Sequence, residues 1–256
     1  MALIQGTNNS DNLYNPPSND IVYLGGGDDT FYVGNGSDTV SGGSGADRIV
    51  YSVSYTSGLK TSIFGESGDD YISVFYAGDS NLYGGEGDDR VEGGRNDDRI
   101  FGGNDNDTLF GDYGNDRIYG EEGDDLIYGS VGSDTLVGGN GNDTIYGFEL
   151  DYSSDSGFIE GVKNEKDTMY GGGGADLFVL GIYSTVPYTV SKGADLAYIE
   201  DFQSGEDKIQ LVGSASDYLL GESGGDTIIY ENYSLDTVAI VRDNGGLSFS
   251  SDFVFA

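Results

Sequence analysis

The sequence contains no cysteine and no histidine in 256 residues. The absence of cysteine excludes disulfide bonds, which commonly stabilise extracellular proteins. The absence of both residues excludes the usual zinc sites, cysteine nucleophiles, serine–histidine triads and histidine acid–base catalysis. The string Gly221–Gly225 has the G-x-S-x-G pattern of a hydrolase nucleophile, but no histidine is present to activate its serine.

Basic residues and long apolar runs are also scarce. Only 11 Lys and Arg stand against 45 Asp and Glu, which gives a net charge of -34. This charge argues against nucleic acid as a partner and would force a compact fold apart unless cations neutralised it. No apolar run approaches the roughly 18 residues of a membrane-spanning helix, so we expect no membrane span. Met1–Gly6 has neither a charged start nor a long apolar stretch, so we expect no Sec-type signal peptide.

Low hydrophobicity with high net charge is typical of disordered chains. Two features argue against permanent disorder here. The sequence holds 20 Tyr and 12 Phe besides many aliphatic residues, and these apolar residues recur at a fixed period. We therefore expect a folded chain whose charge is neutralised by bound cations.

The period is nine residues. Five consecutive units fill residues 6–50, namely GTNNSDNLY, NPPSNDIVY, LGGGDDTFY, VGNGSDTVS and GGSGADRIV. Eight units fill residues 75–146, namely FYAGDSNLY, GGEGDDRVE, GGRNDDRIF, GGNDNDTLF, GDYGNDRIY, GEEGDDLIY, GSVGSDTLV and GGNGNDTIY. GESGDDYIS precedes the second tract at 65–73, and VKNEKDTMY and GGGGADLFV end at Val179, which makes sixteen units.

Each position of the unit has a physical reason. The glycine positions allow the positive φ of a sharp turn, and Asn96 and Asp105 are tolerated substitutes at the fourth position. The Asp at the sixth position supplies a hard oxygen ligand suited to Ca²⁺. The eighth position is apolar throughout the two long tracts, so we expect a short strand that points this side chain inward.

The units resemble G-G-x-G-x-D-x-U-x, the nonapeptide of the RTX calcium-binding repeat proteins. The resemblance covers residues 6–179. It implies an all-β fold, a right-handed parallel β-roll (β-solenoid) with a C-terminal β-rich cap. Two units complete one coil of such a roll, so residues 18 apart stack on each other.

In that family each Ca²⁺ ion lies between two stacked turns, bound by Asp carboxylates of both turns and by backbone carbonyls of the glycine-rich positions. The resemblance thus implies roughly eight to twelve Ca²⁺ ions, each with 6–8 oxygen ligands. The implied Asp ligands are Asp11, Asp20, Asp29, Asp38, Asp47, Asp70, Asp89, Asp98, Asp107, Asp116, Asp125, Asp134, Asp143, Asp167 and Asp176. The implied turn positions are Gly25, Gly27, Gly34, Gly36, Gly43, Gly45, Gly68, Gly85, Gly87, Gly94, Asn96, Gly103, Asp105, Gly114, Gly123, Gly132, Gly139, Gly141, Gly172 and Gly174.

Stacking predicts one row of Asp at each edge of the roll. In the second tract these rows are Asp89, Asp107, Asp125 and Asp143 on one edge, and Asp98, Asp116 and Asp134 on the other. We expect weak ion sites at Pro16 and Pro17, which replace glycine, and at Ser80, which replaces Asp.

The register of the repeats divides the sequence into six parts. They are a first β-roll tract at 1–50, an irregular insertion at 51–64, a second β-roll tract at 65–146, an insertion loop at 147–161, the last repeats at 162–179, and a C-terminal cap with a secretion signal at 180–256. In the cap, Leu196–Leu211 resembles the segment that follows the repeats in RTX proteases and lipases. Ser251–Ala256 resembles the family's type I secretion signal.

The resemblance implies a secreted, extracellular or cell-surface protein that leaves through type I secretion machinery and folds on Ca²⁺ outside. No H-E-x-x-H string is possible, and repeats and cap leave no room for a protease or lipase domain. We therefore expect a structural, adhesive or surface-matrix role without enzymatic activity. One alternative is a carbohydrate-active site on the insertion loop, with Glu149, Asp151 and Glu160 as its carboxylates. The other is a Ca²⁺-dependent module that acts with a partner.

Aromatic residues recur at the ninth position, where an exposed strand is usually polar: Tyr14, Tyr23, Tyr32, Tyr83, Phe101, Phe110, Tyr119, Tyr128 and Tyr146. Stacked coils align them into ladders. One interpretation is stabilisation of the sheet by stacking in register. The other is a surface that binds glycans, matrix or another copy of the chain.

Overall fold

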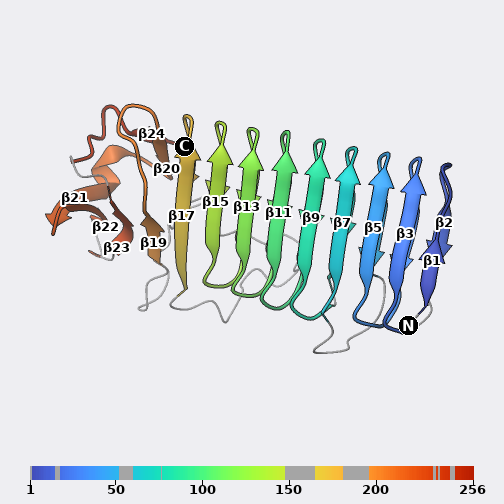
Figure 1. Ribbon diagram of the computed structural model, residues 1–256. Coiled ribbons are helices and arrows are strands. Elements are labelled where there is room, and N and C mark those ends of the chain that lie inside the picture. The colour runs from blue at the N-terminus through green and yellow to red at the C-terminus, as the bar shows by residue number, and fades with distance from the viewer. Residues whose placement is uncertain are drawn as a thin grey trace.

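The computed structural model describes residues 2–14, 18–51, 60–75, 77–147, 165–180, 196–232, 235, 237–242 and 246–256. These residues form two sheets that enclose one core, and successive coils stack along a single direction (Figure 1). The one helical element in the described part is the 3-10 turn η1 (Ala215–Asp217), so the predicted all-β, parallel roll is confirmed. No helix among the described residues is long and apolar enough to cross a bilayer.

Sheet A has 13 strands. In spatial order they are β1 (Leu3–Gln5), β3 (Ile21–Gly26), β5 (Thr39–Ser44), β7 (Ser62–Ser67), β9 (Asn81–Glu86), β11 (Arg99–Asn104), β13 (Arg117–Glu122), β15 (Thr135–Asn140), β17 (Lys166–Gly173), β19 (Leu196–Ile199), β23 (Thr237–Val241), β22 (Asp226–Glu231) and β21 (Tyr218–Ser223).

Sheet B has 11 strands. In spatial order they are β2 (Asn12–Tyr14), β4 (Thr30–Val33), β6 (Arg48–Tyr51), β8 (Tyr71–Ser73), β10 (Arg90–Glu92), β12 (Thr108–Phe110), β14 (Leu126–Tyr128), β16 (Thr144–Tyr146), β18 (Leu177–Val179), β20 (Lys208–Leu211) and β24 (Phe253–Phe255). The chain alternates between the sheets, so each coil contributes one strand to each.

The parallel register follows the predicted interval. Ile100 pairs with Ile118, 18 residues on, and every regular coil repeats this interval. Where the sequence is irregular the coil is longer: Val40 pairs with Ile63, and Leu136 with Met169. The extra residues therefore do not shift the strands, because the apolar eighth positions hold the strands in register.

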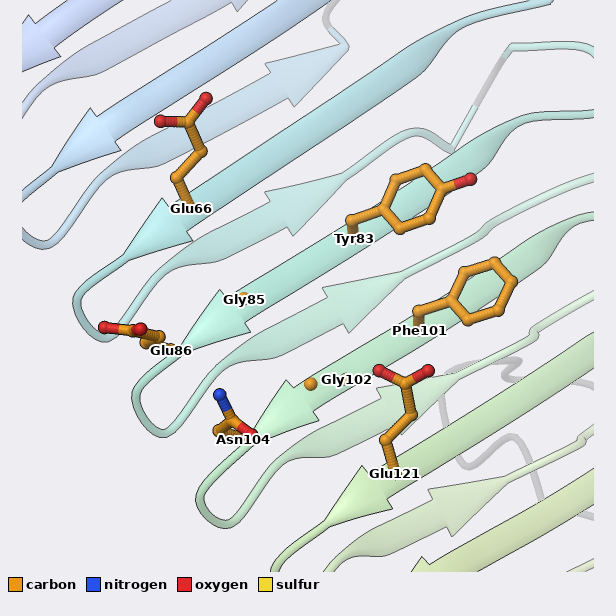
Figure 2. Close-up of a pocket in the computed structure, with 9 residues that line it drawn as sticks. Glu66, Tyr83, Gly85, Glu86, Phe101, Gly102, Asn104 and Glu121 are labelled. Atoms are coloured by element: carbon orange, nitrogen blue, oxygen red, sulfur yellow. The ribbon is translucent and has the colours of Figure 1, made fainter.

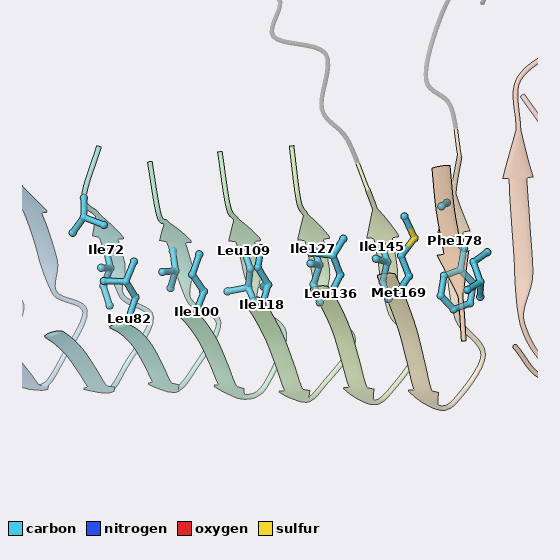
Figure 3. Close-up of a cluster of buried hydrophobic side chains, with 14 of the residues drawn as sticks. Ile72, Leu82, Ile100, Leu109, Ile118, Ile127, Leu136, Ile145, Met169 and Phe178 are labelled. Atoms are coloured by element: carbon cyan, nitrogen blue, oxygen red, sulfur yellow. The ribbon is translucent and has the colours of Figure 1, made fainter. Parts of the chain in front are cut away.

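The core is a file of these eighth-position side chains. Figure 3 shows Ile72, Ile100, Ile127 and their neighbours in line between the two sheets. From Val22 to Phe178 they have no exposed surface. Burying one such side chain stabilises the fold by about 1.5–3 kcal/mol. Hydrophobic register alone therefore places the turns, and with them the polar residues of the edges.

Parallel stacking continues beyond the last nonapeptide. Strand β19 pairs with β17 and β20 with β18, so Leu196–Leu211 forms a further coil of the roll. Strands β23 and β24 add one more parallel layer, and the antiparallel strands β21 and β22 close sheet A. The segment that the sequence assigns to the cap thus begins in register with the repeats.

Candidate metal centre

The Asp at the sixth position lies directly before a strand or at its start, so coiling gathers these residues at two edges. Those before strands of sheet B form the first row: Asp11, Asp29, Asp47, Asp70, Asp89, Asp107, Asp125, Asp143, Asp176 and, in the following coil, Asp207. Those of sheet A form the second row: Asp20, Asp38, Asp98, Asp116, Asp134 and Asp167. The first row follows the turns at the arrowhead end of β3 to β17 in Figure 1.

One carboxylate oxygen, Oδ1, of each row Asp after Asp11 accepts a hydrogen bond from the coil before it. The Asp89 N–H donates to Asp107 Oδ1 at 2.8 Å, and the Asp107 N–H donates to Asp125 Oδ1 at 2.8 Å. In the second row the Asp98 N–H donates to Asp116 Oδ1 at 2.7 Å. The same bond links every neighbouring pair of the first row. Each carboxylate is therefore held against the turn one coil earlier.

The other oxygen, Oδ2, is buried and accepts no hydrogen bond in eleven of these residues, namely Asp29, Asp47, Asp70, Asp89, Asp98, Asp107, Asp116, Asp125, Asp134, Asp143 and Asp176. Buried polar atoms are normally hydrogen-bonded, because leaving one unpaired costs about 1–3 kcal/mol and more when it is charged. A regular series of such atoms along two edges points to ligand oxygens rather than to isolated packing faults.

Burial also raises the pKa of these carboxyls, since desolvation disfavours the charged form. In the first row the pKa of Asp107 rises to about 8, although the N–H of Asp89 lowers it. In the second row desolvation and the charge of Asp116 raise the pKa of Asp98 to about 9. Near neutral pH the rows therefore need either protons or cations to be stable.

Glycine is required at the first position because the site has no room for a side chain, and not because the backbone needs a positive φ. A Cβ atom on Gly84 would overlap Asp89 Oδ2 and lie 2.6 Å from the Gly102 carbonyl oxygen of the next coil. The corresponding glycines along both rows show the same crowding. A carboxylate oxygen and a carbonyl oxygen of adjacent turns thus converge on a space that only glycine leaves open.

The glycines expected at the second and fourth positions have positive φ, with Gly34 as the exception. Asn96 and Asp105 replace glycine at the fourth position, and the backbone keeps a positive φ at both, 76° at Asn96 and 74° at Asp105. Their turns therefore keep the shape of the others, as their residue types predict.

The ends of the rows differ from the middle. Asp11 Oδ2 accepts hydrogen bonds from the Thr7 N–H at 2.7 Å and the Thr7 hydroxyl at 2.9 Å. Asp207 Oδ2 accepts one from the Gln203 N–H at 2.7 Å, and Asp20 Oδ2 accepts one from a serine hydroxyl of its own turn. These terminal carboxylates are less available, because Oδ2 already accepts a hydrogen bond within its own turn. They are therefore poorer ligand candidates than the carboxylates in the middle of each row.

The second row is interrupted twice in succession. Thr61 stands before β7 and Ser80 before β9, where the row would have Asp. The Ser80 hydroxyl donates to the Gly78 carbonyl at 2.8 Å, so its turn closes on itself. The weak point expected at Ser80 is thus a wider gap that includes Thr61. The other expected weak points, Pro16 and Pro17, and the insertion-loop carboxylates Glu149, Asp151 and Glu160 lie outside the described residues.

The side chains at the fifth position form a second series of hydrogen bonds between coils, which was not predicted from the sequence. The Asn106 N–H donates to Asp88 Oδ1 at 2.9 Å, the Asp124 N–H to Asn106 Oδ1 at 2.8 Å, and the Asn142 N–H to Asp124 Oδ1 at 2.7 Å. These side chains reach toward the following coil, opposite to the sixth-position Asp. The signal was present in the sequence, because this position holds Asp, Asn or Ser in most units.

The donor set suits a hard cation. Carboxylate and carbonyl oxygens are the ligands that Ca²⁺ prefers, while soft metals prefer the thiolate and imidazole groups that this chain lacks. In the described part no three acidic side chains cluster into a closed site. Adjacent turns instead offer two row carboxylates together with backbone carbonyls, which is a ligand set shared between coils.

Comparison with known families agrees with this chemistry. A family model of the RTX calcium-binding nonapeptide repeat, built of four copies, matches residues 17–49, 76–109, 101–136, 128–149 and 165–182. No curated protein matches the chain. The matched ranges hold the middle of both Asp rows, and the family description names calcium-binding repeats only.

Proposed function

The chain belongs to the family of RTX calcium-binding nonapeptide repeat proteins, and on that premise we propose that it folds on Ca²⁺ outside the cell and serves there as a structural or adhesive surface component. It is a calcium-binding repeat protein, so the proposal concerns where the ions bind and what the folded roll does. The observation that carries it is the series of buried Oδ2 atoms without hydrogen bonds.

The residues that would hold the ions are the Asp residues of both rows whose Oδ2 is open, with carbonyls of the adjoining turns. Roughly eight to twelve ions fit the number of stacked Asp pairs, at 6–8 oxygen ligands each. Each ion would replace the protons that the raised carboxyl pKa values otherwise favour. It would also remove two negative charges from a chain whose net charge is -34.

Folding and ion binding are then one event, because the ligand oxygens of a site come from separate coils. Extracellular modules bind Ca²⁺ with dissociation constants of about 10⁻⁴–10⁻³ M, far above its concentration in cytosol. The chain would stay unfolded inside the cell and fold after export. The segment resembling a secretion signal supports this order, since Asp252 and Phe253 are buried beside β20 in the folded protein and are accessible only before folding.

A structural or adhesive role is supported by where the charge lies. The acidic residues concentrate at the turns, while the outer faces of the sheets carry rings and few charges. Such faces suit contact with glycans, matrix or other copies of the chain.

Circular dichroism with and without chelator tests the proposal. In EGTA near neutral pH we expect the spectrum of an unfolded chain, and on addition of millimolar Ca²⁺ a cooperative gain of β signal. Mg²⁺ at the same concentration serves as the control, because it demands a smaller octahedral site and dehydrates reluctantly. A protein that is fully folded in EGTA would overturn the proposal.

A further inference from the structure

The outer face of sheet A carries three parallel rows of side chains. The seventh, ninth and second positions point outward along β3 to β17, because they alternate with the buried eighth and first positions. The ninth-position row includes a ladder of stacked rings, Phe64, Tyr83, Phe101 and Tyr119, with centroids 4.7, 4.9 and 5.0 Å apart. The rings cover each other's faces and present their edges to solvent.

Two arginines lie on one side of the ring ladder. Arg99 and Arg117 are exposed and face each other across β11 and β13. Like charges directly opposite each other destabilise a sheet pair. Among the described residues neither forms an ion pair, whereas Arg90 on sheet B binds Glu92 at 2.6 Å. The pair on sheet A thus has charge available for a partner.

Two glutamates and a groove lie on the other side of the ladder. Glu66 and Glu121 occupy the second position with φ of 81° and 83°, where the other strands from β3 to β17 have glycine. Gly85 and Gly103 lie between them on the neighbouring strands. Because glycine has no side chain, a groove of about 320 Å³ remains open beside the rings (Figure 2). An incoming side chain could therefore enter between two carboxylates.

The face as a whole is neutral at these outward positions. From β3 to β17 the charged residues in the three rows are Arg99, Arg117, Glu66 and Glu121. The net charge of -34 therefore resides elsewhere, chiefly on the turns where Ca²⁺ would reduce it. A second copy meets little local repulsion on this face once the rows hold their ions.

We propose that this face binds the same face of a second copy, in a two-fold dimer whose axis runs along the roll between the two ring ladders. This axis sets the seventh position of each strand opposite the second position of the same strand in the partner. Arg117 then faces the partner's Glu121, and Arg99 faces the partner's Gly103 and enters its groove. Each contact occurs twice.

The charges select this axis over the other in-plane one. A two-fold axis along the strands would set each row opposite the same row of the partner, so no arginine would face a glutamate. Centred on β3 to β17, it would set Glu66 opposite the partner's Glu121, which costs free energy. Eight strands about 4.8 Å apart, each about 16 Å across, bury about 1,200 Å² in total, at the lower end for specific interfaces. We therefore expect a dimer whose population depends on protein concentration.

The inference rests on the calcium-dependent fold proposed above, and sedimentation of the full chain in millimolar Ca²⁺ tests it. We expect a monomer–dimer equilibrium whose dissociation constant rises about tenfold or more in Arg117→Glu and in Glu121→Arg. An equimolar mixture of these two variants, and the double variant, should recover the dimer, because each restores opposite charges at the reciprocal contact. Arg90→Glu on sheet B is the control and should leave the equilibrium unchanged.

Two outcomes overturn the dimer and are distinguishable from failure of the calcium proposal. A wild-type protein that is folded by circular dichroism yet monomeric contradicts the dimer and leaves the calcium-dependent fold intact. Single variants that weaken the dimer without recovery in the mixture contradict this axis. A chain that does not fold on Ca²⁺ contradicts both proposals at once.

Discussion

The first row of carboxylates runs unbroken from Asp11 to Asp207, whereas the second row stops at Asp38 and resumes at Asp98. Both rows lie on the same coils and share the same core. The roll keeps its register across the gap, since Ile63 still pairs with Leu82. The comparison shows that hydrophobic register places the strands, while the Asp rows decide where charge must be neutralised.

At the gap no buried row carboxylate needs an ion, although Thr61 Oγ1 is itself buried without a hydrogen bond. Thr61 and Ser80 carry no charge, and the Asn96 side-chain amide donates to the Ala77 carbonyl at 2.8 Å. Lys60 binds Asp79 at 3.3 Å on the surface beside it. Two neighbouring coils of one edge are thus held by hydrogen bonds and one ion pair, while the other edge of the same coils depends on carboxylates.

The largest expected effect is that of pH on the calcium-free protein. Burial raises the pKa of row carboxyls from about 3.9 to values from about 6 at Asp125 to about 9 at Asp98. A raised folded pKa means that the calcium-free fold is favoured below the unfolded pKa and loses stability as pH rises through the folded pKa. In chelator we expect β signal near about pH 4 and its loss by about pH 8. Equal spectra at both pH values would contradict this.

The next largest effect should come from copying the gap into the first row. Asp70→Thr with Asp89→Ser removes ligands from three neighbouring stacked pairs, and we expect a loss of about 2–4 kcal/mol of stability in saturating Ca²⁺. Asp69→Thr with Asp88→Ser is the matched control, because it removes the same charge from the exposed fifth positions of the same turns. Chemical denaturation of both variants in Ca²⁺ measures the difference. Equal losses would mean that the first row holds no ions there.

A smaller effect is expected from crowding a single turn. Gly120→Ala would set a Cβ over Asp125 Oδ2 and 2.5 Å from the Gly138 carbonyl oxygen. We expect this to cost about 1–3 kcal/mol and to raise the Ca²⁺ concentration needed for folding. Gly173→Ala is its control, since the nearest atom there is Asn140 Oδ1 at 3.4 Å. Calcium titrations followed by circular dichroism compare the two, and identical midpoints would refute the convergence of ligand oxygens at this position.

The smallest effect is expected from repairing the gap. Thr61→Asp with Ser80→Asp makes the second row continuous, and in saturating Ca²⁺ the added sites should stabilise the roll by about 1–2 kcal/mol. In chelator the same variant should be less stable than wild type, because two more buried carboxylates lack ligands. Thermal unfolding in both buffers tests whether the double variant is more stable than wild type in Ca²⁺ and less stable in chelator. Destabilisation in both would show that the gap cannot hold ions.

Much of this architecture could be predicted from the nine-residue period. The inward eighth position, the Asp rows and the coil of two units all follow from periodicity, and the pairing of Ile100 with Ile118 confirms the interval. The coil at Leu196–Leu211 could not, because it has the apolar alternation of a strand without glycine-rich turns. The pairing of Val40 with Ile63 places Thr61 in the second row, directly before β7.

The arrangement on the outer face also needed the structure. The sequence predicts that rings align, but the groove arises because Gly85 and Gly103 lie between Glu66 and Glu121 on neighbouring strands. That juxtaposition joins residues more than fifty positions apart. Only the stacking of coils, fixed by the core, brings them together.

The anomalous scattering of calcium in crystals grown with Ca²⁺ tests the central claim most directly, because it locates each ion. We predict peaks between successive first-row residues from Asp29 to Asp176 and between second-row residues from Asp98 onward, with none beside Thr61 or Ser80. A crystal whose rows hold no calcium, or one with an ion in the gap, would contradict the account.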